Sequence, residues 1–310
     1  MNHSQEWIQT ATGPIPAADL GRTYIHEHLR IDLSAYKNDP DADLNEPELI
    51  AAELRKIKQQ GINALVEVTN RGMGRDVRLS KRLAEDSGIR VIVSTGFYKE
   101  PFFPPEVHQL TERELAEILR KELLEGIGDT GIKAHVIGEI GTIQDAIAPA
   151  ERKVFAAAAR AHRETGRPIF THTTLGTMAL EQLQLLQQEG VDLSKVVISH
   201  LDLRCDLDYH LRVADSGCFL GFDTIGKLKY ESDQRRAELI RELIDRGHLR
   251  QIVLAQDITR RSHLTANGGT GYGYLWDEFL PILKRSGVRD EAIETLLVEN
   301  PRRLLAVQAL

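Results

Sequence analysis

The chain has 310 residues, of which 42% are hydrophobic and 27% charged, and its formal net charge at pH 7 is -7. This is the composition of a globular protein with a sizeable core, and the net acidity argues against nucleic acid as the main partner. No apolar run is long enough to span a bilayer, and the opening residues, MNHSQEWIQT, lack the basic and apolar regions of a signal peptide. We therefore expect a cytoplasmic protein that acts on a small molecule away from membranes, with its two cysteines reduced.

Apolar segments rich in β-branched residues alternate with amphipathic helical segments along the chain. Several helical segments, such as EPELIAAELRKIKQQG, end in glycine, as expected for a helix C-cap. Eight such units favour a (β/α)8 barrel of the TIM type, in the α/β class, over an open sheet. No Gly-x-Gly-x-x-Gly motif follows the first strand, which weakens a dinucleotide-binding interpretation. In chain order, the predicted strands are 23–29, 62–69, 89–97, 133–141, 168–173, 196–202, 219–224 and 251–258.

We expect a single barrel domain over residues 1–310, in which 1–22 form a short lead-in that could contain a hairpin. Near the other end, the segment VENPRRLLA predicts a helix that stops before Pro301, followed by a short closing helix.

Side chains that can bind metals gather at the predicted strand ends, where (β/α)8 barrels build their active sites. In the segment His26-Glu27-His28 the two histidines point to the same face, because side chains alternate along a strand. Each residue alone has an ordinary explanation, since a strand histidine is often a hydrogen-bonded core residue and an aspartate can cap a helix. Six such residues on one rim fit coincidence poorly, and an unpaired buried glutamate would be costly. The candidate metal ligands are His26, His28, Glu139, His172, His200 and Asp257.

Four histidines and two carboxylates exceed what one catalytic ion needs, and they suit two divalent ions that share a carboxylate. We assign His26, His28 and Asp257 to the more buried ion, and His172 and His200 to the other. The glutamate has the length and the two oxygens to bridge both ions. This ligand set favours Zn²⁺, although Mn²⁺, Fe²⁺, Co²⁺ or Ni²⁺ would be accepted by the same side chains.

Further polar side chains follow the third and eighth strands on the predicted rim. The tyrosine among them could donate a hydrogen bond to a substrate oxygen, or it could merely stack within its loop. The cationic residues could be solvated loop charges or form ion pairs with helix carboxylates. Alternatively, they could bind an anionic group of the substrate, as guanidinium groups do with carboxylate, sulfonate or phosphate. The candidate substrate contacts are Tyr98, Lys99, Arg260, Arg261 and His263.

Six segments resemble, in order, the phosphotriesterase-related family of the amidohydrolase superfamily: GRTYIHEHL, GEIGT, GRPIFTHT, VVISHLD, AQDITRRSHL and VENPRRLL. The resemblance covers nearly the whole chain, from Gly13 to Leu304. It implies a (β/α)8 hydrolase with two metals that acts on lactones, esters, amides or organophosphates. It also makes a homodimer possible.

The chain departs from that family at three places. Where phosphotriesterases bridge the metals with a carbamylated lysine, this chain has Gly138, and the resemblance points to Glu139 as the bridge. Lys133 lies too far upstream, at the wrong end of the strand, to replace it. Leu203 and Thr224 stand where phosphotriesterases have an aspartate and a histidine or arginine, so the usual proton relay and one lactone-site residue are expected to be absent. The loop after the eighth strand, TRRSHLTANGG, is more cationic than in lactonases, and we do not expect efficient paraoxon-type hydrolysis.

The main hypothesis is a hydrolase in which a hydroxide between two metal ions attacks an ester, lactone or amide carbonyl of a substrate with an anionic group. Asp257 would accept the proton of this hydroxide and pass it to the leaving group. One alternative is a phosphoester or phosphotriester hydrolase with the same ligands. Another is a metal-bound small-molecule receptor without turnover, but the complete ligand set counts against it because a receptor has little need of an open two-metal site.

Overall fold

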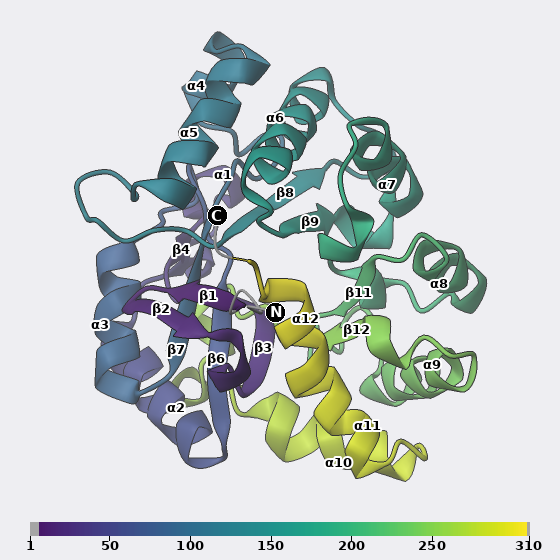
Figure 1. The fold of residues 1–310 in the computed structure, drawn as a ribbon. Coiled ribbons are helices and arrows are strands. Elements are labelled where there is room, and N and C mark those ends of the chain that lie inside the picture. The colour runs from purple at the N-terminus through teal and green to yellow at the C-terminus, as the bar shows by residue number, and fades with distance from the viewer. Residues whose placement is uncertain (1–5, 309–310) are drawn as a thin grey trace, which may run out of the picture.

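The computed structural model describes residues 6–308, in which eight parallel strands form a barrel-like sheet with helices around it (Figure 1). Strands that are consecutive in the chain are neighbours in the sheet, which is the order of a (β/α)8 barrel and confirms the predicted α/β fold. The strands are β3 (Arg22–Glu27), β6 (Ile62–Glu67), β7 (Arg90–Thr95), β8 (Val136–Thr142), β9 (Ile169–Thr173), β10 (Val196–Ile198), β11 (Phe219–Phe222) and β12 (Ile252–Leu254).

The barrel closes where the first and last strands of the sheet, β3 and β12, meet. The backbone N–H of Asp257 donates to the carbonyl of His26 at 3.3 Å. The buried carboxylate of Glu27 accepts hydrogen bonds from the N–H groups of Gln256, at 2.8 Å, and Ile258, at 3.1 Å. These bonds satisfy backbone groups that would otherwise lack strand partners. They also hold the end of β3 next to the segment after β12, which brings the predicted metal ligands His26 and Asp257 together.

The strands are apolar on both faces because each face is covered. Side chains such as Ile25, Val66, Phe170 and Val253 pack together in one buried cluster, whereas a larger apolar cluster lies between the strands and the helices. Several helices around the sheet carry their own start signals, for example the capping box of Thr111 and Glu114. The helices that pack around the sheet include α2 (Pro47–Gln59), α3 (Val77–Ser87), α5 (Glu112–Leu124), α6 (Pro149–Thr165), α7 (Ala179–Gln188), α8 (Leu207–Ala214), α9 (Asp233–Asp245) and α10 (Leu280–Arg285).

Short elements fill the loops between strands and helices. After β3 the chain forms α1 (Ser34–Lys37) and a small antiparallel pair, β4 (Ile31–Asp32) with β5 (Asp43–Leu44), and after β7 it forms α4 (Pro105–Gln109). Within residues 6–308, no helix is long and apolar enough to cross a membrane.

The lead-in contains an antiparallel hairpin of β1 (Trp7–Thr10) and β2 (Gly13–Pro16). A buried histidine ahead of β8 anchors it: His135 Nδ1 is 3.2 Å from the backbone nitrogen of Gln9 and 2.9 Å from Nη1 of Arg167. On its other side, His135 Nε2 lies 2.7 Å from the carbonyl oxygen of Leu305. The N-terminal and C-terminal segments therefore meet at one imidazole.

The prediction that the last helix stops before Pro301 is wrong. Helical backbone continues from α11 (Asp290–Glu294) through a π-helical turn over 295–299 into α12 (Asn300–Leu305). Pro301 lies in the first turn of α12, where a missing N–H costs little, and the wide turn before it accommodates the ring.

Three strands are shorter than predicted at the end that carries the candidate ligands, and the first of them, β3, ends at Glu27, just before His28. β10 ends at Ile198 and β12 at Leu254, so His200 and Asp257 lie in the segments that follow, with φ angles of 63° and 54°. Positive φ is uncommon for residues with a side chain and clusters at functional sites.

Candidate metal centre

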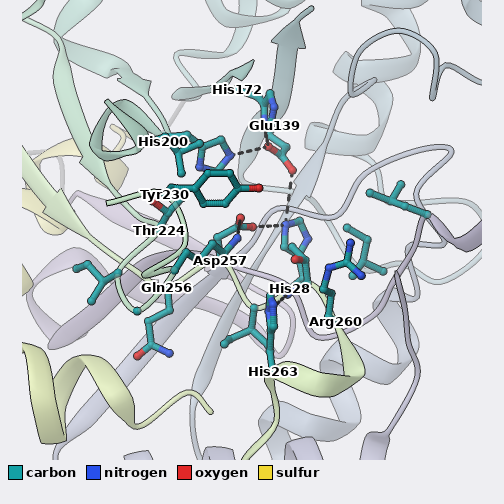
Figure 2. Close-up of a pocket in the computed structure, with 18 of the residues that line it drawn as sticks. His28, Glu139, His172, His200, Thr224, Tyr230, Gln256, Asp257, Arg260 and His263 are labelled. Carbon is teal, nitrogen blue, oxygen red and sulfur yellow. Dashed lines mark hydrogen bonds and ion pairs between the residues drawn. The ribbon is translucent and has the colours of Figure 1, made fainter. Parts of the chain in front are cut away.

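A cavity of about 640 Å³ opens where the strands end, and the predicted ligands converge at it (Figure 2). Five of them line the cavity: His28, Glu139, His172, His200 and Asp257. The sixth, His26, is fully buried, with its Nε2 atom 3.7 Å from Glu139 Oε2. The structure thus brings together all six residues that the strand-end pattern singled out.

The more buried group of candidate ligand atoms comes from β8 and from the ends of β3 and β12, the two strands that meet where the barrel closes. His28 Nε2 is 3.5 Å from Glu139 Oε1 and 3.2 Å from Asp257 Oδ1. His26 Nε2 is 3.7 Å from Asp257 Oδ1 as well as from the glutamate. Two imidazole nitrogens and two carboxylates therefore face one small volume.

The second group shares the same glutamate. Glu139 Oε2 is 2.9 Å from His172 Nδ1 and 3.4 Å from His200 Nε2. In each group, three side chains offer ligand atoms within 4.8 Å of one another, close enough to hold a metal ion. Glu139 is the residue whose oxygens belong to both groups.

The hydrogen bonding of His26, in β3, and His28, just after it, fits a role as metal ligands. Nε2 of His26 and Nε2 of His28 are buried and have no hydrogen-bond partner among the residues described. Their other ring nitrogens are occupied, because His28 Nδ1 lies 2.7 Å from Thr69 Oγ1 and His26 Nδ1 lies 3.3 Å from Ser199 Oγ. A buried nitrogen without a partner is costly, and a cation at this point would satisfy both.

Buried carboxylates give the floor of the cavity a negative potential that favours cations. Burial alone would raise the pKa of Glu139, but its interaction with the ring of His172, whose Nδ1 lies 2.9 Å from Oε2, holds that pKa well below the ordinary value. Burial also opposes ionisation of Asp257, yet the charge of Lys227 keeps the pKa of that carboxyl well below normal. Burial lowers the pKa of His172 to about 4, so its ring is neutral, which is the form that binds metals.

Asp223, which follows β11, is a further candidate functional residue that sequence reasoning missed. It accepts hydrogen bonds from the backbone N–H of His200 at 2.7 Å and from Nδ1 of the same ring at 2.9 Å. Its second oxygen is 3.4 Å from His26 Nδ1. One carboxylate therefore orients two ligand rings and leaves their Nε2 atoms facing the cavity. Its place just after a barrel strand was the signal that could have found it.

Gly138 occupies a position where no side chain fits. A Cβ atom there would lie 2.1 Å from the carbonyl oxygen of Phe170, and the backbone has a φ of 136°. A lysine ligand at this position is excluded by the backbone itself, and Lys133 precedes the start of β8. Glu139 is the residue of this strand that faces both histidine pairs.

Four of the five predicted substrate contacts line the cavity: Tyr98, Lys99, Arg260 and His263. The hydroxyl of Tyr98 is 3.2 Å from His172 Nε2, and Arg260 is already paired with Asp39 at 2.5 Å. Arg261 is the exception, since it pairs with Glu46 at 2.8 Å, its side chain is 52% exposed, and it is not among the lining residues. Leu203 and Thr224 line the cavity as well.

A family model for the phosphotriesterase family matches residues 6–305. The chain belongs to the phosphotriesterase family. It is 46% identical over 281 residues to the phosphotriesterase homology protein of Escherichia coli, covering 91% of this chain and 96% of that protein. It is 33% identical over 341 residues to the N-acetyltaurine hydrolase of Homo sapiens, covering 96% and 97% of the two chains.

Solved structures of this family agree in fold. The E. coli protein, crystallised with phosphate in its active site, matches with a TM-score of 0.91 at 45% identity, over 93% of this chain and 99% of that one. A lactonase from Listeria monocytogenes matches with a TM-score of 0.92 at 30% identity, over 96% and 98% of the two chains. This phosphotriesterase family member is a metal-dependent hydrolase, as the strand-end residues and the sequence motifs predicted.

Proposed function

We propose that the protein is a two-metal hydrolase that cleaves an ester, lactone or amide bond in a small substrate bearing an anionic group. The observation that carries the proposal is the shared glutamate: Glu139 lies within 3.7 Å of two separate pairs of histidine nitrogens. A carboxylate between two sets of imidazole nitrogens suits two cations close together.

In this proposal His26, His28 and Asp257 hold one ion, His172 and His200 hold the other, and the glutamate serves both. A pair of divalent cations would supply a water molecule of lowered pKa and a Lewis acid for the carbonyl oxygen. Imidazole and carboxylate donors make zinc the metal we propose.

The remaining steps fall to side chains of the chain itself. Asp257, whose Oδ1 faces the two buried imidazoles, is the side chain that would accept a proton and return it to the leaving group. The hydroxyl of Tyr98, beside His172, can donate a hydrogen bond to a substrate oxygen. These side chains come from different loops, so a substrate is oriented from several sides at once.

The environment of Lys99 supports the proposal that the substrate bears an anionic group. It is 9% exposed and lines the cavity, and within residues 6–308 no carboxylate forms an ion pair with it. Its closest hydrogen-bond acceptor is the carbonyl oxygen of Glu100, at 3.4 Å. A buried ammonium without a counter-ion is unfavourable, and an anionic substituent would relieve it. The human relative named N-acetyltaurine hydrolase, whose substrate carries a sulfonate, is consistent with this assignment.

A phosphoester hydrolase is the second candidate. It is favoured by the phosphate in the active site of the E. coli relative. The same ligands would serve both reactions, and the shape of the cavity would decide between them. A receptor without turnover is not supported, because the relatives are named hydrolases, lactonases and amidohydrolases.

The test is reconstitution of metal-stripped protein followed by a substrate panel. We expect activity to return with two equivalents of Zn²⁺, Mn²⁺ or Co²⁺, and to be highest on N-acyl amines or lactones that carry a carboxylate or sulfonate. Neutral analogues of the same length should be poorer substrates. Full activity after removal of all metal would refute the proposal, and a preference for phosphomonoesters would favour the second candidate.

A further inference from the structure

The loop between β11 and α9, residues 223–232, carries a lysine into the metal centre. Nζ of Lys227 forms an ion pair with Oδ2 of Asp257, and the lysine side chain is 16% exposed. The sequence gives no sign of this contact, because the two residues lie in different loops, 30 positions apart. Figure 2 shows Asp257 between the imidazole of His28 and the residues of this loop.

The two oxygens of Asp257 have different partners. Oδ1 lies 3.2 Å from His28 Nε2 and 3.7 Å from His26 Nε2, whereas Oδ2 is taken by the ammonium of Lys227. A carboxylate that is free to turn can offer one or both oxygens to a cation. The ion pair fixes which oxygen faces the histidines.

The backbone of Lys227 is itself held in place. Its N–H donates to the carbonyl of Thr224 at 3.0 Å, and its carbonyl accepts from the N–H of Tyr230 at 3.1 Å. The fully buried guanidinium of Arg236 points Nη2 at the same carbonyl, 3.5 Å away. The ammonium is therefore presented from an anchored turn.

Arg236 connects this turn to the rest of the centre. Its Nε donates to Asp202 at 2.9 Å, and its Nη1 donates to Asp233 at 3.0 Å. Asp202 also accepts the N–H of Asp223 at 3.2 Å, and Asp223 is the residue that orients His26 and His200. The buried guanidinium of Arg236 thus supports both the histidine side and the aspartate side of the cavity.

We propose that Lys227 is a positioning residue that holds Oδ2 of Asp257 and so limits this carboxylate to one oxygen, Oδ1, at the metal site. The inference rests on the proposed function, since it treats Asp257 as a metal ligand. Among residues 6–308, Lys227 is the one lysine or arginine that forms an ion pair with Asp257. Without it, the carboxylate can turn, offer both oxygens to the metal, and lose the orientation needed to accept a proton.

The test compares wild-type protein with Lys227→Met and Lys227→Arg, each loaded with Co²⁺. In Lys227→Met we expect the visible absorption per cobalt to fall, because a second oxygen raises the coordination number. We expect kcat to fall about 10- to 100-fold, as is typical when a residue that orients a ligand is removed, with little change in KM. Lys227→Arg keeps a cationic donor and should restore most of the spectrum and of kcat.

Lys229→Met is the matched control. Lys229 is on the same loop and exposed, and its Nζ lies 4.6 Å from the ring centroid of Tyr230 rather than near Asp257. This variant should keep the wild-type cobalt spectrum.

The inference fails if Lys227→Met keeps the wild-type spectrum and kcat, or if it raises KM alone, which would make Lys227 a substrate contact. A wild-type protein that retains no metal would instead refute the proposed function, and this inference with it. Circular dichroism and melting curves of each variant exclude misfolding as the cause of a lost activity.

Discussion

Replacing Lys99 by methionine separates recognition of the substrate from stability of the fold. The lysine lies over two aromatic rings, with Nζ 5.5 Å from the centroid of Tyr98 and 5.4 Å from that of Phe102. Methionine keeps an unbranched apolar chain against these rings and removes only the charge. Burial lowers the pKa of Lys99 below its ordinary value, which shows that the ammonium is poorly solvated here. The variant should therefore lose its anion partner without losing its packing.

The magnitude follows from the kind of contact that is removed. A hydrogen bond to a charged group contributes about 1.5–3 kcal/mol, which corresponds to a decrease of about 10- to 150-fold in kcat/KM for an anionic substrate. Around Lys99 burial outweighs the attraction of Glu151 and Glu139, since the pKa of Lys99 is lowered, so the melting temperature without substrate should stay the same or rise. Substrate recognition and stability are thus expected to move in opposite directions.

The assay measures kcat/KM on a matched pair of substrates, an N-acetylated aminosulfonate and a neutral N-acetyl amine of equal length, together with melting curves without ligand. Arg261→Met serves as the control, because Arg261 is paired with Glu46 outside the cavity and should affect neither substrate. Equal losses on the two substrates would refute the reasoning. A lower melting temperature with an unchanged preference for the anionic substrate would make Lys99 a structural residue.

Three further predictions concern the metal centre and the opposite end of the barrel. Asp257→Asn should retain metal but lose about 10²- to 10⁴-fold in kcat, and wild-type turnover would exclude its proton-transfer role. Glu139→Gln should reduce the bound metal from two ions to one or none, as measured by elemental analysis, since both groups of ligands lose their shared charge; two tightly bound ions in this variant would contradict a bridging role. Burial and the charge of Arg167 lower the pKa of His135 to about 3, against 6.5 for an ordinary histidine. Between pH 3 and pH 6.5 the unfolded chain therefore binds one more proton at His135 than the folded chain does. The free energy of unfolding should thus fall by about 1.4 kcal/mol per pH unit as the pH drops below 6.5. Denaturant titrations of His135→Gln should show a shallower loss of stability in acid, whereas the exposed His108→Gln should follow the wild type.

The fold and the convergence of the candidate ligands could be predicted because both depend on local patterns. Alternation of apolar strands with amphipathic helices specified eight βα units, and the topology of a barrel then placed all strand ends on one rim. Six candidate ligands could be found from this rule without knowing a single distance. The precise ends of β10 and β12 were less accessible, because the backbone leaves the strand before His200 and Asp257 and adopts a positive φ at each.

Contacts between different loops could not be predicted in the same way. For Arg260 the sequence left open a substrate contact or an ion pair with a carboxylate, and it did not identify Asp39 and Asp41, from the loop after β3, which reach it across more than 200 residues of sequence. The roles of Asp223 and Lys227 likewise depend on which side chains other loops bring near them. Pattern and spacing place a residue on the rim, and only the folded chain decides its partner.

The lack of space at Gly138 has a consequence for how the active enzyme is assembled. A lysine becomes a bridging ligand only after it has reacted with carbon dioxide, whereas a glutamate is complete when the polypeptide is made. Because a Cβ at position 138 would lie 2.1 Å from the carbonyl oxygen of Phe170, this strand has no room for a lysine side chain at that position. Maturation of the protein should therefore require metal salts alone, and its activity should be insensitive to dissolved bicarbonate.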